Sequence, residues 1–589
     1  MILFPPVVAL GIFLFSYLPG RLLLESVPSL SRREKFCLSF FVTYIFLYLT
    51  CFILFMIVPY PARAYRVLFV LSLLTMAASY KKIIMIFSDK EERKLLLQGL
   101  LMLLWLAGYQ ALHRMYGGGR WTGDWFEHFE RARFLMIHYF KEYQFILMYY
   151  FPSRPPLFNT LCAFFLSFFG YKFWIFQIVC SLLNMSLVFP AWLLVCALFK
   201  KRRIVPLLAI IALFMLNPAM VRQMLYTMTK GLSAAYVLAG VYLYLKARDT
   251  LDRKYCIFAF LFLSAGVLVH YSAAPFFLGV GADFTILTLK KPSRKKFFTF
   301  ACAAILSAAF IFTWLSYSLV FYGARITFLS NTSYTDSKNF SFVQRIGKDL
   351  YNLRTTFLPN LFETRGFWSP ISSLKYIIMY DFSAVFYSES LTGNLTISLS
   401  LFLILFLLGR MKDYFYKSLR ILSFPSGLFW ILFLGAGGLI AIATNGGRMD
   451  NGTAHVSFVP VAGLVLGIAY LLAQDLPSKL FRRLLAFGMI LESFFFFALS
   501  IIVLSDIFIE TSVMLYSATL YTNYAIRDVN NLEFLEGIYH SYSIPLAFLV
   551  LIGWMIWAGI FVKSMKNGGA RILMANAPET PISSSSCNP

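Results

Sequence analysis

Apolar runs of about 17 to 25 residues recur from one end of this chain to the other, and clusters of Lys and Arg separate alternate pairs of runs. A helix of that length crosses the hydrocarbon core of a bilayer. The pattern therefore predicts an all-α polytopic membrane protein with about 15 transmembrane helices. The predicted crossings are 1–24, 37–58, 66–86, 95–112, 174–199, 204–220, 226–245, 255–270, 272–289, 297–321, 391–409, 421–444, 455–473, 484–505 and 541–562.

The basic clusters form one series that is consistent with a single orientation, because cytoplasmic loops carry the excess of Lys and Arg. Placing every cluster inside puts the N-terminus outside and the C-terminus inside. Three large loops then lie outside, at 113–155, 322–390 and 506–540. The clusters are Arg32 to Lys35, Lys81 to Lys94, Lys200 to Arg203, Lys246 to Lys254, Lys290 to Lys296, Arg410 to Arg420, Lys479 to Arg483 and the tail from Lys563.

One apolar segment, 156–170, is only about 15 residues long and does not fit the series. Counting it as a crossing would invert every later basic loop, so we interpret it as a partial or re-entrant helix. The chain then divides, by position, into N-terminal helices, a central module that contains the first large loop, a second external loop, C-terminal helices and a disordered cytoplasmic tail. These parts are 1–94, 95–321, 322–390, 391–562 and 563–589.

Composition supports this assignment and limits the classes of partner. With 59% hydrophobic residues, 13% charged residues and a mean hydropathy of +0.72, the chain is too apolar for a soluble globular protein. The net charge of +25 falls in the loops assigned to the inside, so we expect membrane lipids and no nucleic acid as partners. The eight cysteines show no disulfide framework and no metal-ligand spacing.

No other stretch of the chain is at once as polar and as aromatic as 120–156, which lies in the first external loop. It contains R-W-T-G-D-W-F-E-H-F-E-R-A-R-F-L and then F-P-S-R-P-P-L. We expect a water-accessible interfacial helix over Trp125 to Ile137, capped by Asp124 and anchored in the membrane by aromatic side chains that include Phe129. Asp124 could act only as the cap, with Glu127 as its i, i+3 partner.

Several cations lie beside this loop, and a phosphate group would suit them. They are His128, Arg131, Arg133 and Arg154. A competing interpretation is that Arg131 and Arg133 extend to lipid headgroups.

The G-D-W-F-E-H-F-E-R-A-R-F-L run in the first large external loop, followed by R-P-P-L at the next helix, resembles the C-type (GT-C) membrane glycosyltransferases. The nearest pattern is that of the aminoarabinose transferase and protein O-mannosyltransferase group. The resemblance covers about residues 95–320 and implies a GT-C-like helical bundle. It also implies that Asp124 lies at the catalytic centre and that Arg154 lies near the phosphate of a polyprenyl-linked donor. The run T-M-T-K-G-L-S-A-A-Y-V-L adds Lys230 in the same way.

In such a transfer the phosphate leaves as a stable anion, so one carboxylate and several cations suffice. We expect Asp124 to be the general base and Arg154 and Lys230 to bind phosphate. Further substrate-binding candidates are Glu127, His128, Arg131, His270 and Arg448. Lys230 could instead be an interfacial anchor at a helix end, His270 a structural residue of a short turn, and Arg448 part of a tight Gly/Asn turn. No cofactor is predicted, although a divalent metal stays open.

The sequence thus predicts an inverting glycosyltransferase in a bacterial inner or plasma membrane, with its site on the external or periplasmic face. The donor is a polyprenyl-phosphate-linked sugar, and the acceptor is a glycan, a lipid or a protein. Two alternatives stay open: a polymerase or ligase of lipid-linked oligosaccharides, which would depend on Arg448 or His270, and a lipid or glycan flippase.

Overall fold

The computed structural model describes residues 4–111, 123–137, 143–145, 149–198, 205–225, 227–248, 252–290, 292–330, 341–357, 395–410, 458–475, 479–504 and 532–575. Within these residues the fold is all-helical apart from one bridge between Phe145 and Tyr149. Eight of the described helices are long and apolar enough to cross a membrane, or nine if one bent pair counts as one span. The helical membrane architecture is as predicted, while the count of about 15 crossings stays a prediction.

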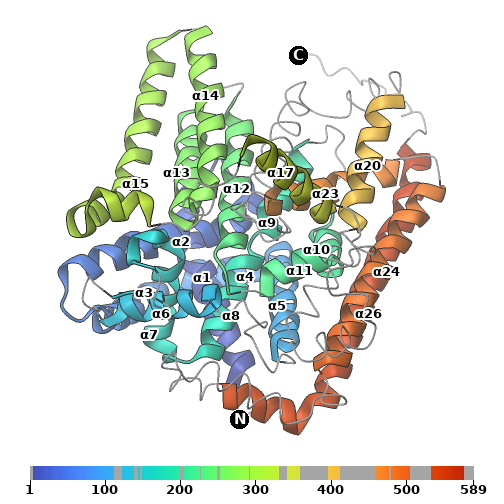
Figure 1. The fold of residues 1–589 in the computed structure, drawn as a ribbon, viewed down its shortest axis with the longest axis horizontal. Coiled ribbons are helices and arrows are strands. Elements are labelled where there is room, and N and C mark those ends of the chain that lie inside the picture. The colour runs from blue at the N-terminus through green and yellow to red at the C-terminus, as the bar shows by residue number, and fades with distance from the viewer. Residues whose placement is uncertain are drawn as a thin grey trace, which may run out of the picture.

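The N-terminal helices are α1 (Phe4–Leu24), α2 (Arg32–Ile57), α3 (Pro61–Ala78), α4 (Tyr80–Ser88), α5 (Lys90–Ala111) and α6 (Gly123–Ile137). The central elements are η1 (Phe151–Ser153), α7 (Leu157–Phe169), α8 (Phe173–Met185), α9 (Val188–Leu198), α10 (Leu207–Leu216), α11 (Pro218–Leu225), α12 (Lys230–Arg248), α13 (Arg253–Val269), η2 (Tyr271–Ala273), α14 (Ala274–Lys290) and α15 (Arg294–Leu329). The C-terminal helices are α17 (Phe342–Phe357), α20 (Leu395–Arg410), α23 (Phe458–Asp475), α24 (Lys479–Leu504) and α26 (Leu532–Ala575). In Figure 1, α14 and α15 project on one side, and α24 and α26 lie on the other.

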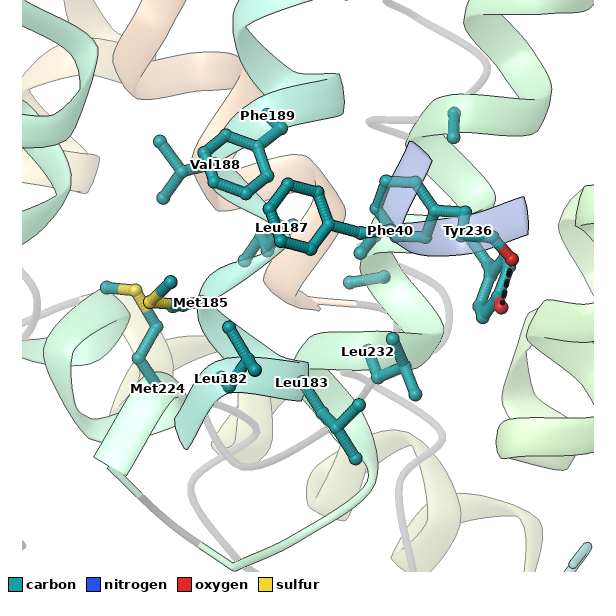
Figure 2. Close-up of a cluster of buried hydrophobic side chains, with 14 of the residues drawn as sticks. Phe40, Leu182, Leu183, Met185, Leu187, Val188, Phe189, Met224, Leu232 and Tyr236 are labelled. Atoms are coloured by element: carbon teal, nitrogen blue, oxygen red, sulfur yellow. Dashed lines mark hydrogen bonds between the residues drawn. The ribbon is translucent and has the colours of Figure 1, made fainter. Parts of the chain in front are cut away.

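The core is centred on α8 and α9, which are buried along their length and surrounded by helices distant in sequence. Figure 2 shows Phe189 beside Phe40 of α2, and their rings stack with centroids 5.0 Å apart. The same figure places Leu183 of α8 near Leu232 of α12. These contacts hold the centre of the chain against α2 and α12, which carry site elements described below.

The segment predicted as a crossing over 204–220 is broken, because α10 and α11 meet at a bend of 92°. Asn217 has φ −93° and ψ 117°, an extended conformation that suits the residue before a proline. Pro218 follows directly, and it has no N–H to continue the helix. Asn217 Oδ1 accepts a hydrogen bond from the Met220 N–H and so caps the second half.

Two other predicted boundaries change. The crossing predicted over 66–86 is divided between α3 and α4, which break at Ser79. The tail predicted as disordered from Lys563 continues as the last turns of α26 to Ala575. Met565, in that extension, is buried, so apolar packing keeps this part helical beyond the predicted crossing.

Segment 156–170 contains the 13-residue helix α7. A helix of that length is about 20 Å long, which is short of the roughly 30 Å hydrocarbon core. Its interpretation as a partial or re-entrant helix is consistent with this length and stays an interpretation. The crossing predicted over 421–444 and most of the loop 322–390 lie outside the described residues.

Basic loops that the sequence assigns to the inside lie at one end of the molecule, here called the basic end. Ion pairs among five residues mark this end: Arg21, Glu25, Glu34, Glu92 and Lys246. Arg21 pairs with both Glu25 and Glu92. Lys246, near the end of α12, pairs with Glu34 of α2. These pairs hold α1, α2, α5 and α12 together at this end of the molecule.

Candidate functional site

Helix α6 carries the candidate site, and it packs on α3 and α7 instead of lying open to water. It begins at Gly123, so Asp124 lies within its first turn and not before the helix as an N-cap would. Glu127 and His128, expected to be water-accessible, are 0% and 3% exposed. Phe129, expected to anchor in the membrane, is also buried, and its ring stacks on that of Tyr171 at 4.4 Å.

The buried side of α6 holds an ion cluster of three residues, Glu127, Arg131 and Arg154. The Nε of Arg131 donates to Glu127 Oε1 at 2.7 Å, and both side chains are 0% exposed. Arg154 Nε lies 3.8 Å from the same oxygen, and its side chain is 14% exposed. Among the described side chains of this cluster two cations face one carboxylate, and the more accessible of the two is Arg154. A guanidinium at the edge of a desolvated site attracts an anion.

Arg131 holds the segment from which Arg154 projects. Its guanidinium donates to the carbonyl oxygens of Phe151, at 2.6 Å, and Tyr150, at 3.1 Å, and to Ser153 Oγ. Burial lowers the pKa of this guanidinium and the Glu127 carboxylate opposes that shift, so it stays charged. The interpretation of Arg131 as a side chain that extends to lipid headgroups is wrong, because it is fully buried.

The turn that follows α13 also holds the segment that carries Arg154. Tyr271 Oη donates to the Pro152 carbonyl oxygen at 3.0 Å, and Trp314 Nε1 donates to Tyr271 Oη at 3.3 Å. His270, just before η2, accepts the Ser272 N–H at Nδ1 and so caps the turn. His270 is therefore brought beside the segment that carries Arg154.

His128 lies on the α7 side of α6. Its Nδ1 is 3.1 Å from Oδ1 of Asn159, a buried residue of α7. The ring also contacts Phe158, with centroids 5.9 Å apart. These contacts fix the imidazole between α6 and α7, one helical turn beyond the backbone of Asp124.

Lys230 lies on a different element from the ion cluster. It is the first residue of α12 and is half-buried. Asn184 of α8 fixes this turn: its Nδ2 donates to the Met228 carbonyl at 2.8 Å, and its Oδ1 accepts from the Leu232 N–H at 3.0 Å. Helix α12 also contacts η2, which joins this helix to the segment that carries Arg154. Asn184 and Tyr271 were not predicted, because a lone polar residue in an apolar run gives no periodic signal.

Gly231 is the point of closest approach between α12 and α8, because a Cβ there would lie 2.7 Å from Asn184 Cβ. Asn184 is buried and bonded at both ends, so it has no room to move aside. We expect Gly231→Ala to lower stability by about 1–3 kcal/mol through overpacking. Thermal unfolding of the purified protein would measure this. Gly347→Ala in α17, where nothing lies within 4 Å, is the control and should be neutral or stabilising; equal effects would contradict the clash.

The structure brings Glu127, His128, Arg131 and Arg154 together and places His270 and Lys230 on adjoining elements. The register of α6 puts position 124 on the helix face shared by 127, 128 and 131. The Asp124 side chain and Arg448 lie outside what the structure describes. Among the described residues, no three of His, Cys, Asp or Glu are placed to hold a metal ion.

The end of the molecule that carries these elements is opposite the basic end. Tyr65, at the start of α3, donates from its hydroxyl to the carbonyl oxygens of Cys51 and Leu135, at 3.1 Å each, and so holds the end of α6 at the second half of α2. Glu34 of the basic end lies in the first turn of α2. The length of α2 thus separates the two ends.

Comparison with known proteins gives matches only at the level of structure. No model of a protein family matches the chain, and no curated protein matches it. Crystal structures of ArnT from Cupriavidus metallidurans are similar: the form bound to undecaprenyl phosphate is 12% identical with a TM-score of 0.43, covering 82% of this chain and 76% of that one. The apo form is 11% identical with a TM-score of 0.44, covering 82% and 77%. ArnT is a GT-C aminoarabinose transferase, the group that the loop motif resembles.

Proposed function

We propose that this chain is an inverting, GT-C-type membrane glycosyltransferase that moves a sugar from a polyprenyl-phosphate carrier to an acceptor. The observation that carries the proposal is the ion cluster, in which Arg131 and Glu127 are buried and hold Arg154 at its exposed edge. A phosphate with a lipid tail needs such a cation at the end of a helical bundle. The motif resemblance around Asp124, Arg154 and Lys230 supports the same activity.

In the proposed reaction Asp124 takes the proton from the acceptor hydroxyl as its oxygen attacks the anomeric carbon. The bond between that carbon and the phosphate oxygen breaks, and the electron pair leaves with the phosphate. Arg154 and Lys230 stabilise the negative charge of this leaving group. Attack opposite the leaving group inverts the anomeric configuration, and no acid is needed because the phosphate leaves as an anion.

The site is proposed to face the periplasm or cell exterior of a bacterial inner or plasma membrane. Its elements are at the opposite end of the bundle from the basic end, and basic loops are retained in the cytoplasm. The polyprenyl-linked donor and the acceptor, whether glycan, lipid or protein, would then meet at the outer surface.

The test is transfer of radiolabelled sugar by the purified protein from a panel of polyprenyl-phosphate sugars to added acceptors. We expect turnover with at least one donor and release of polyprenyl phosphate in equal amount. Turnover only with pyrophosphate-linked oligosaccharides would favour a polymerase or ligase. Movement of lipid across liposomes without turnover would favour a flippase.

The described membrane spans support a flippase less than they support a glycosyltransferase. Glu492 is a buried carboxylate in the middle of α24, a depth at which transporters carry functional charges. It accepts hydrogen bonds from the backbone N–H and the hydroxyl of Thr396, at the start of α20, and so acts as a helix cap. These two hydrogen bonds hold the start of α20 against α24, which is a structural role.

Arg154→Gln should weaken donor binding about 10-fold or more and leave folding intact, because charged hydrogen bonds to phosphate are worth roughly 1.5–3 kcal/mol. The measurement is KM for the donor together with binding of polyprenyl phosphate. Arg133→Gln, on the same loop but stacked on Tyr171, is the matched control. Unchanged donor affinity in Arg154→Gln would remove this residue from the phosphate site.

A further inference from the structure

A buried cluster of neutral polar groups lies between α5, α8 and the turn after α11; it is here called the amide cluster and consists of Gln110, Gln177, Ser181 and Thr227. Gln110 Nε2 donates to Ser181 Oγ at 2.7 Å, to the Leu225 carbonyl at 2.9 Å and, more weakly, to the Gln177 carbonyl at 3.5 Å. The three acceptors fix the direction of the Gln110 amide, so Oε1 is turned away from them.

Three side-chain atoms of this cluster have no hydrogen-bond partner among the described residues. They are Gln110 Oε1, Gln177 Nε2 and Thr227 Oγ1. The residues are 2%, 2% and 0% exposed, so bulk water does not reach them. Buried polar groups are nearly always bonded, so three unpaired atoms on adjoining elements call for hydrogen-bond partners that the described residues do not supply.

The elements that carry the amide cluster lead to Lys230 and contact helix α6. Thr227 is in the turn that leads to Lys230, and Asn184 holds that turn against α8. Gln177 follows Phe176, whose ring lies 5.2 Å from that of Phe129 on α6. The turn from Thr227 to Lys230 therefore links the amide cluster to the proposed phosphate site.

The orphan atoms also define the chemistry of that group. Gln110 Oε1 accepts a hydrogen bond, Gln177 Nε2 donates one, and Thr227 Oγ1 does either. Sugar hydroxyls match all three. An ammonium group does not, because Gln177 Nε2 has nothing to give it and the cations Lys230 and Arg222, the latter buried on α11, lie on neighbouring elements.

We infer that the amide cluster binds the sugar of the donor and selects an uncharged, hydroxyl-bearing sugar over an amino sugar. This inference rests on the proposed function, since it assumes a sugar linked to the phosphate at Lys230. Gln110, Gln177 and Thr227 are assigned to sugar specificity, with no role in the chemical step.

Two substitutions separate sugar binding from folding. Thr227→Val is nearly isosteric and removes a hydroxyl that makes no hydrogen bond here. Gln177→Met removes a side-chain amide whose nitrogen also makes no hydrogen bond. Both should unfold at the wild-type temperature or above it, because a buried orphan group costs stability. Ser307→Ala on α15 is the control, since Ser307 Oγ is also a buried orphan but lies outside the cluster.

The experiment measures binding of three lipids to each protein in nanodiscs: polyprenyl phosphate, polyprenyl-phosphate hexose and a polyprenyl-phosphate amino sugar. We expect the wild type to bind the hexose lipid more tightly than either of the others. Thr227→Val and Gln177→Met should each weaken hexose-lipid binding about 3- to 10-fold and leave polyprenyl phosphate unchanged. Ser307→Ala should change neither.

Hexose-lipid affinity that persists in both variants, equal loss for all lipids, or wild-type preference for the amino sugar would overturn the sugar site and leave the proposed function standing. A wild type that binds none of the three lipids would overturn the proposed function and the sugar site with it.

Discussion

Asp124→Asn is expected to reduce sugar transfer by about 10²- to 10⁴-fold, the range that general-base catalysis contributes. The amide keeps the size of the side chain and cannot accept the proton of the acceptor hydroxyl. Donor binding should be unchanged, because the phosphate is assigned to Arg154 and Lys230. The loss should therefore appear in kcat, with KM for the donor nearly constant.

The matched control is Glu130→Gln, a carboxylate on the same helix that accepts a hydrogen bond from Tyr143 at 3.0 Å. It should retain most of its activity. The pH dependence provides a second readout: the acidic limb of the wild-type rate profile should be absent from the residual activity of Asp124→Asn. Equal turnover in Asp124→Asn and the wild type would place the base elsewhere.

Arg131→Met is expected to destabilise the protein by about 3–5 kcal/mol, the cost of breaking a buried ion pair. The substitution leaves Glu127 with Arg154, 3.8 Å away, as its nearest described cation. It also removes the hydrogen bonds to the backbone of Tyr150 and Phe151. The unfolding midpoint in detergent, by heat or denaturant, measures the loss.

Arg133→Met, two residues later, is the control. Arg133 is only partly buried and its guanidinium stacks over the Tyr171 ring at 5.5 Å. Partly exposed contacts of this kind are worth about 1 kcal/mol or less. If Arg131→Met unfolded no more easily than Arg133→Met, the buried pair would not be what holds the loop.

The helices were predictable because hydrocarbon length and basic loops leave a strong signal in the sequence. The bend at Asn217 and Pro218 was visible in principle, since a proline inside an apolar run ends or kinks a helix. It was missed because the flanking run was long enough to count as one crossing.

Part of the site was predictable and part was not. The loop motif pointed to Glu127, His128, Arg131 and Arg154 as substrate-binding candidates, and the structure brings these four residues together. Their burial was not predicted, because whether the polar face of a helix meets water or another helix depends on tertiary packing. The partners Asn159, Asn184 and Tyr271 come from other helices, and a single sequence carries no record of such contacts.

The pairing of Glu34 with Lys246 has a consequence for biogenesis. The two residues are 212 positions apart, and at 5–20 residues per second a ribosome needs roughly 10 to 40 s to make the intervening chain. During that interval α2 carries a carboxylate whose final basic partner has not been made. The hairpin of α1 and α2 should therefore insert incompletely into the membrane at its cytoplasmic end. It should reach its final position in the membrane only when α12 is inserted.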